Sequence, residues 1–303
     1  MFAASSMFAQ LGMPLSQFSG NQLVHNPAWA GFEGVLSVNL SARKQWVQLP
    51  GSPSLMGFNA HMPLRNDRHA LGVVFMRETW GPISGNFAYI NYAYNLLLGS
   101  NVLSFGVQAG AYNHLTDWDK IEHVIDPFCP FLGKGQMRNT NFDANFGVYF
   151  LTNSYYFGLS VKHLVPPKLD FGNNIPTVET WYPHMSTQFF FKGGTIVPLG
   201  QKWSLRPELF MRYVHHTPLT VNVGTFGSYM NRYFFGVNYQ TGQHSVSFSV
   251  RGFVTNNIRI GYSYDVYFGA IRKAQHGSHE ISLNWLIDHF WSRDQRAISL
   301  PWL

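Results

Sequence analysis

Apolar and polar residues alternate with a period of two through most of this 303-residue chain. The segments 245–253 and 258–266 show the pattern clearly. In the first of them, Phe248 and Val250 point to one side of an extended chain, and Ser249 between them points to the other. A helix repeats every 3.6 residues and could not keep such sets on single faces. The alternation therefore predicts β-strands that each have one apolar and one polar face.

These alternating segments run for about 10 residues, the length of a strand that crosses a bilayer at a tilt, whereas soluble strands usually have five or six. Charged residues make up only 12% of the chain, about half the share in soluble proteins. Aromatic residues reach 17%, yet the mean hydropathy is −0.09. We find no apolar run of about 18 residues, the minimum for a spanning helix. The sequence predicts an all-β protein, a transmembrane antiparallel up-and-down β-barrel.

A soluble β-sandwich or lipocalin-like barrel is the alternative fold. Strands of such folds recur every 8–12 residues, whereas the repeat here is closer to about 18. We therefore expect about fourteen long strands in one barrel. They are 33–46, 52–63, 69–79, 84–98, 101–113, 141–151, 154–164, 184–197, 203–214, 218–228, 231–240, 243–254, 257–267 and 278–288.

The connections between these strands are asymmetric. After even-numbered strands they are short, as at 99–100 and 152–153. After odd-numbered strands several are long, namely 115–140, 165–183 and 268–277. Outer-membrane barrels have short periplasmic turns and longer external loops. The asymmetry predicts a barrel in the outer membrane of a Gram-negative cell, and strand parity then predicts that both termini are periplasmic.

Aromatic residues gather near the ends of the predicted strands, as expected for the girdles at the two membrane interfaces. They are Trp46, Trp80, Tyr92, Tyr94, Tyr155, Tyr156, Trp203, Tyr213, Tyr233, Tyr267 and Trp285.

Four regions divide the chain. Residues 1–9 are small and apolar up to Ala9, which is typical of the end of a signal peptide. Residues 10–32 form an N-terminal periplasmic or lumenal segment, 33–288 form the barrel, and 289–303 form a C-terminal tail.

Both ends of the barrel sequence carry distinctive strings. The N-terminal side has Gln17-Phe18-Ser19 and Asn26-Pro27-Ala28-Trp29-Ala30-Gly31, and the first predicted strand ends in Arg43-Lys44-Gln45-Trp46. The last predicted strand begins with Gly277-Ser278-His279-Glu280. In combination these strings resemble the PorP/SprF family of outer-membrane proteins, which belong to the type IX secretion and gliding machinery of Bacteroidetes. The tail after Asp288 departs from the family pattern.

The resemblance implies a non-enzymatic barrel with a signal peptide that supports type IX secretion or gliding motility. Its partners would be outer-membrane lipid together with periplasmic ring or motor proteins, a large secreted adhesin, or both. We expect no cofactor, no metal, no catalytic residue and no nucleic acid partner. The residues that it marks as family motif or structural are Asn26, Pro27, Ala28, Gly31, Arg43, Gln45, Trp46, Gly277, Ser278, His279 and Glu280.

Elementary chemistry gives these strings a structural role as well. Asn26-Pro27 is typical of a turn, and Gly31 permits a tight bend. Side chains alternate along the first strand, so Arg43 faces the lumen. Glu280 is the expected carboxylate partner of Arg43, because the first and last strands of a closed barrel must pair. We expect the strings to organise barrel closure, and a partner surface is the alternative.

Other residues with reactive side chains stand apart from these strings. We interpret the carboxylates and imidazoles of segment 113–126 as a solvated external loop rather than a divalent cation site, because the spacing fits no known motif. They are His114, Asp117, Asp119, Glu122, His123 and Asp126. His215-His216 lies at the end of the ninth predicted strand. Cys129 has no base next to it in the sequence, and we interpret it as structural.

Two other functions stay open at this stage. The first is an outer-membrane channel for small solutes, which polar lumenal residues would suit. The second is a lipid-active barrel enzyme, although no Gly-x-Ser-x-Gly elbow is present. The net charge of +6 comes from scattered basic residues, which disfavours nucleic-acid binding.

Overall fold

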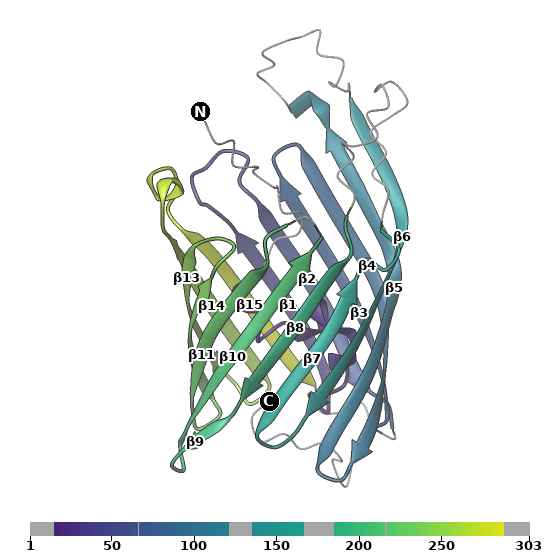
Figure 1. The fold of residues 1–303 in the computed structure, drawn as a ribbon, viewed down its shortest axis with the longest axis vertical. Helices are drawn as coiled ribbons and strands as arrows, with labels where there is room; N and C mark the ends of the chain where they lie inside the picture. Colours follow the sequence, from purple (N-terminus) through teal and green to yellow (C-terminus); the bar gives the residue numbers. More distant parts are fainter. Residues whose placement is uncertain (1–14, 66, 121–134, 167–184, 216, 288–303) are drawn as a thin grey trace.

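The computed structural model describes residues 15–65, 67–120, 135–166, 185–215 and 217–287 (Figure 1). Its helical elements are short: α1 (Gln22–His25), η1 (Pro27–Trp29), η2 (Trp118–Lys120) and η3 (Ala270–Lys273). None of the helices among these residues is long and apolar enough to span a membrane. The strands are β1 (Leu36–Lys44), β2 (Ser54–Pro63), β3 (His69–Trp80), β4 (Ile83–Leu98), β5 (Asn101–Asp117), β6 (Gln136–Leu151), β7 (Tyr155–Lys162), β8 (Gln188–Thr195), β9 (Val197–Leu199), β10 (Trp203–Val214), β11 (Thr220–Tyr229), β12 (Tyr233–Gln240), β13 (Ser245–Phe253), β14 (Ile258–Tyr267) and β15 (Ser278–Ile287).

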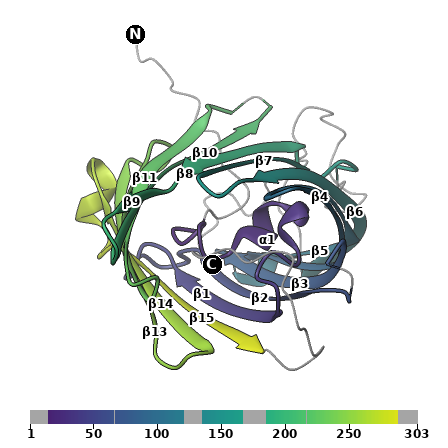
Figure 2. The ribbon, with the colours of Figure 1, turned by 90° about the horizontal axis from the view of Figure 1, so that it is seen from below.

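Apart from β8 and β9, strands that follow one another along the chain pair antiparallel, and β1 pairs with β15 to close the sheet (Figures 1 and 2). The segments β8 and β9 both pair with β10, so they are consecutive parts of one stave. The barrel thus has fourteen staves, which confirms the predicted up-and-down transmembrane barrel and its strand count. Closure matters because an open edge in a bilayer would leave backbone groups without partners.

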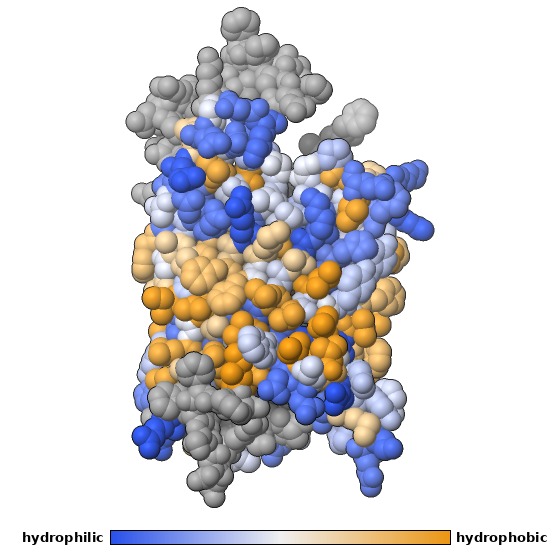
Figure 3. Space-filling model, turned by 180° about the vertical axis from the view of Figure 1, so that it is seen from behind, coloured by the Kyte–Doolittle hydropathy of each residue, from blue (hydrophilic) through white to orange (hydrophobic). Residues whose placement is uncertain are grey.

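The alternation sorts side chains as predicted. On β13, Phe248 is 50% exposed on the outer wall, whereas Ser247 beside it is fully buried on the lumen side. A band of apolar side chains covers the outside of the barrel between two more polar zones (Figure 3). The lumen side holds the buried polar residues, Asn91, Asn145 and Asp265 among them.

Two strands are longer than predicted. β5 continues to Asp117 and β6 begins at Gln136, so this hairpin projects beyond its neighbours (Figure 1). The predicted external loop 113–126 was therefore placed wrongly at its start. His114 is buried within β5, where its imidazole lies 3.1 Å from the Tyr112 hydroxyl. Of the other residues in that set, Glu122, His123 and Asp126 lie outside the described residues, as do Cys129 and His216.

The predicted aromatic girdles are also wrong in part. Trp203 and Tyr155 are about half exposed on the outer wall, as expected. Tyr156 and Tyr267 are buried on the lumen side instead, with exposed fractions of 4% and 1%. Their hydroxyl groups bind lumenal polar groups, which a phenol can do while its ring stays packed.

Of the described residues ahead of β1, 15–34 lie inside the barrel. Figure 2 shows α1 within the ring of strands. The regions expected as a signal peptide remnant (1–9) and as a tail (289–303) lie outside the described residues.

Candidate functional site

Residues 15–34 occupy the lumen, and we call this segment the plug. Ser16 lies beside Arg43 and Glu280, close to the strand ends that lead into the long loops. Gly31 lies against Pro63, at the end of the barrel with the short turns. The plug thus runs along the lumen before it enters β1. Its apolar side chains are buried: Leu15, Phe18, Leu23, Val24, Ala28, Trp29, Ala30 and Phe32.

Asn26 joins the plug to the barrel wall. Its side-chain oxygen accepts a hydrogen bond from the Ala28 backbone N–H (2.9 Å) and so caps η1. Its amide nitrogen donates to the carbonyl oxygens of Val148 (3.0 Å) and Leu159 (3.1 Å), on the neighbouring strands β6 and β7. An asparagine that reads as a turn residue in the sequence therefore also holds two strands.

Carbonyl groups of the next two plug residues accept hydrogen bonds from the wall. Asn91 of β4 donates to the Pro27 carbonyl (3.0 Å), and Ser104 of β5 donates to that of Ala28 (2.7 Å). Gly106 allows this close approach, because a methyl group there would overlap the Pro27–Ala28 backbone. The small wall residue is what lets η1 lie flat against β5.

Gly31 has a φ of 82°, which favours glycine and supports the predicted bend. Its N–H donates to the imidazole of His61 on β2 (3.1 Å). On either side of it, Trp29 and Phe32 pack edge-on and tilted against Tyr149 of β6, with ring centroids 5.1 and 5.6 Å apart. The bend and the aromatic contacts fix the plug at this end.

A buried charge cluster joins the first and last strands. Arg43 pairs with Glu280 across the β1–β15 register, with a nitrogen–oxygen distance of 3.4 Å, as the closure argument predicted. Its other terminal nitrogen lies 2.6 Å from Asp265 of β14. All three side chains are at most 1% exposed. One cation thus holds two carboxylates at the seam of the barrel.

The plug binds the same cluster. The Ser16 backbone N–H donates to Glu280 (2.8 Å), and its hydroxyl donates to Asp265 (2.7 Å). The Gln17 N–H donates to the second oxygen of Glu280 (3.2 Å). These contacts give the carboxylates partners that Arg43 alone could not supply, as buried charges require. The plug and the seam are one polar network.

The remaining motif residues lie around the loops above the seam. Trp46 donates its backbone N–H to Ser278 (3.1 Å), and the Gly277 carbonyl accepts from Val47 (2.9 Å). The backbone N–H of Gln45 donates to the Pro53 carbonyl within the β1–β2 loop. His279 lies apart from this network: it is on the outer face, where its imidazole contacts the Tyr262 hydroxyl (2.6 Å).

Sequence reasoning missed a second lumenal network. Glu208 of β10 accepts from the Tyr156 hydroxyl (2.9 Å) and lies 3.4 Å from the Lys192 ammonium. That ammonium also lies over the Phe18 ring of the plug, 5.2 Å from its centroid. Strand parity could have placed each of these wall residues on the lumen side, but the register that brings them together has no local signal.

Where the plug meets β1, Glu33 pairs with Arg259 of β14 at 3.1 Å. Burial is the largest single effect and favours the neutral carboxyl. The charges of Arg259 and His61 and hydrogen bonds from Ser37 and Arg259 together outweigh it and lower the pKa of Glu33 below its ordinary value. The pair fixes the exit of the plug electrostatically.

The plug leaves little space around it. The three described cavities that it lines enclose about 60, 20 and 10 Å³. No cluster of three or more metal-binding side chains occurs in the described ranges. The arrangement holds the plug in the lumen.

A closed, fourteen-stave barrel with an apolar outer band and an occupied lumen belongs to the class of outer-membrane β-barrels. The sequence matches the family described as type IX secretion system membrane protein PorP/SprF over residues 7–285, and the chain belongs to that family. Family membership implies that it associates with type IX secretion components in the outer membrane. No curated protein matches the chain.

Solved outer-membrane barrels share the fold at low sequence identity. The CymD monoaromatic hydrocarbon channel is 11% identical, with a TM-score of 0.52 over 89% of this chain and 93% of that one. A Pseudomonas aeruginosa FadL homologue is 12% identical, with a TM-score of 0.50 and coverages of 86% and 92%. Acinetobacter baumannii Omp33 is 7% identical, with a TM-score of 0.50 and coverages of 84% and 98%. These likenesses concern the fold alone.

Proposed function

We propose that this protein is a non-enzymatic barrel that supports type IX secretion through surfaces that bind partners, and that its lumen is not a solute route. The observation that carries the proposal is the plug. Residues of β1, β2, β4, β5, β6, β7 and β15 hydrogen-bond to it. Withdrawing it would leave many of these buried groups without partners, at about 1–3 kcal/mol each.

The orientation is part of this proposal. The long-loop end faces the cell exterior and the short turns face the periplasm, as in other outer-membrane barrels. Strand parity then puts the start of β1 and the end of β15 on the periplasmic side, which is the basis for proposing periplasmic termini. Ser16, at the described beginning of the plug, nevertheless lies near the opposite end of the lumen.

The partner at the exterior is a large secreted adhesin-like protein that the barrel helps to export or anchor, and periplasmic ring or motor proteins bind at the other end. This role includes gliding motility where the client is a motility adhesin. Family membership supports these partners, and the projecting β5–β6 hairpin supplies extra wall at the exterior end.

The experiment compares a deletion strain with its complemented parent. We expect loss of one large surface protein, or of several type IX substrates, from the surface proteome while the outer membrane stays intact. The purified full-length protein should show no steady conductance in planar bilayers. Normal secretion together with solute-dependent conductance would contradict the proposal and favour the channel alternative.

A further inference from the structure

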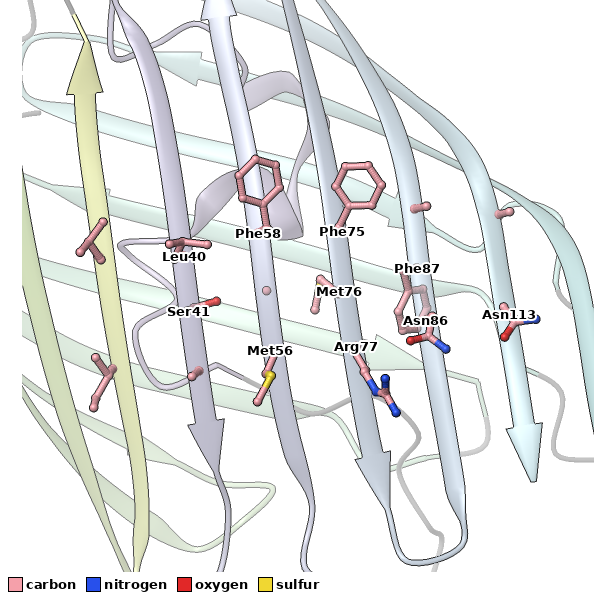
Figure 4. Close-up of a pocket in the computed structure, with 16 residues that line it drawn as sticks. Leu40, Ser41, Met56, Phe58, Phe75, Met76, Arg77, Asn86, Phe87 and Asn113 are labelled. Atoms are coloured by element: carbon pink, nitrogen blue, oxygen red, sulfur yellow. The ribbon is translucent and has the colours of Figure 1, made fainter. Parts of the chain in front are cut away.

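A trough of about 640 Å³ lies on the outer wall, across β15 and β1–β5, and not in the lumen (Figure 4). Two neighbouring rows of outward side chains form its sides, because the strand registers align them across the sheet. One row is Leu283, Leu40, Phe58, Phe75, Ala88 and Ala111. The other row is Ile281, Ala42, Met56, Arg77, Asn86 and Asn113.

Small residues hollow out the trough. Ala42 lies between Ile281 and Met56 in its row. Its small side chain leaves a gap between these two large side chains, which are 57% and 65% exposed. In the other row Ala88 follows Phe75, which is 49% exposed. Figure 4 shows Phe58 and Phe75 along one side and Met56 and Arg77 along the other. These exposed groups face the bilayer.

The trough changes character along its length. The part of the trough that lies over β15, β1 and β2 is apolar on both sides. From β3 onward one side becomes polar, with Arg77, Asn86 and Asn113 in direct cross-strand register. Asn113 continues this row by donating a hydrogen bond to Thr140 of β6 (2.7 Å). The apolar part of the trough thus ends at a guanidinium and two amides. This arrangement fits a molecule with a hydrocarbon chain and an anionic head.

Arg77 makes the match specific. It is exposed on the outer wall, and no carboxylate of the described residues pairs with it. An arginine on the lipid face is costly unless it lies near the interface or meets an anion. A phosphate oxygen pair fits the planar donor fork of a guanidinium.

We propose that the trough binds an anionic, phosphate-bearing membrane lipid, with an acyl chain along Leu40, Met56 and Phe58 and the phosphate beside Arg77. The amides of Asn86 and Asn113 contact the polar head. This site lies on the opposite face of the wall from the plug and is independent of the secretion role proposed above.

Native mass spectrometry of the purified full-length protein tests the site, with phosphatidylglycerol and phosphatidylcholine of identical acyl chains as probes. Wild-type protein should retain phosphatidylglycerol severalfold more than phosphatidylcholine. Arg77→Gln should reduce that preference to near parity. Arg138→Gln is the matched control, since Arg138 is exposed on β6 outside the trough, and it should keep the preference.

A second variant tests the apolar part without a change of charge. Ala42→Trp fills the apolar part of the trough from an exposed position on β1 and should reduce retention of both lipids. The mobility shift between heated and unheated samples on gels verifies that each variant is a folded barrel. Equal retention of the two lipids by the wild type or no effect of Arg77→Gln would overturn the proposal. A lipid-free dimer that Ala42→Trp abolishes would overturn it too, because it would assign the trough to a second copy.

Discussion

At the scale of single residues, the seam cluster shows how closure and lumen occupancy depend on each other. Arg43 neutralises two carboxylates that come from β14 and β15, and the backbone of the plug supplies further donors to them. Each member is buried, so water cannot hydrate any of these groups if its partner is lost. A buried network of this kind is stable only when all its members are present.

Arg43→Met should therefore lower the free energy of unfolding by about 3–5 kcal/mol, because it leaves Asp265 and Glu280 as buried charges without a cation. The heated-gel mobility shift, followed across a urea series, measures this loss. Lys44→Met is the control: Lys44 is the next residue, is exposed on the outer wall and loses only its hydrogen bond to the Ser52 carbonyl (2.8 Å), so we expect a change of about 1.5 kcal/mol or less. Equal losses for the two variants would contradict the network.

At the scale of elements, the wall strands are shaped to receive the plug. Gly106 of β5 and Gly147 of β6 stand where any side chain would overlap Ala28 or Asn26. The η1 turn therefore packs on two strand backbones at close range. Glycine usually weakens a strand, so its presence here has a packing reason.

Gly106→Ala tests this fit. The added methyl group has to displace the plug backbone, which should cost about 1–3 kcal/mol of folding stability and raise conductance in planar bilayers. Gly227→Ala on β11 is the matched control, because a methyl group there meets nothing within 4 Å. If both variants kept wild-type stability and conductance, the plug would not occupy the position described.

The outer face of a strand makes a separate prediction. Phe248 is half exposed on the apolar band, so Phe248→Arg should lower folding stability by about 2–4 kcal/mol near the bilayer midplane. Phe248→Leu should change it by less than about 1.5 kcal/mol, since it keeps an apolar group there. A loss for Leu as large as that for Arg would mean that this side chain does not face lipid.

At the scale of the whole molecule, the alternation and the loop lengths were enough to predict the barrel, because each strand faces lipid on one side and the lumen on the other. The alternation of side chains along β1 also predicted that Arg43 faces the lumen, and barrel closure then put it opposite Glu280. The plug contacts could not be predicted: Ser16 and Glu280 are 264 positions apart, and an irregular segment has no periodicity. The burial of Tyr156 and Tyr267 was not predicted either. Their positions near strand ends favoured an interface girdle, and the sequence has no local signal of the lumenal groups that they contact.

The proposed orientation predicts which connections are accessible on living cells. An epitope tag inserted at Asp119, within η2 at the long-loop end, should be labelled on intact cells. A tag in the Gly99–Ser100 turn, between β4 and β5, should be labelled only after the outer membrane is permeabilised. The reverse pattern would invert the barrel in the membrane.

The proposed function requires the barrel to serve secretion with its plug in place. A short, reducible thiol-specific cross-linker between Asn21→Cys and Asn59→Cys, whose native amide tips meet at 2.6 Å, would lock the plug to β2 in a Cys129→Ser background. The direct measurement is the amount of type IX substrate on the surface of cells whose only copy is this locked variant. We predict the wild-type amount, with or without reductant. Secretion that stops after cross-linking and returns on reduction would contradict this requirement, because it would mean that the lumen has to open.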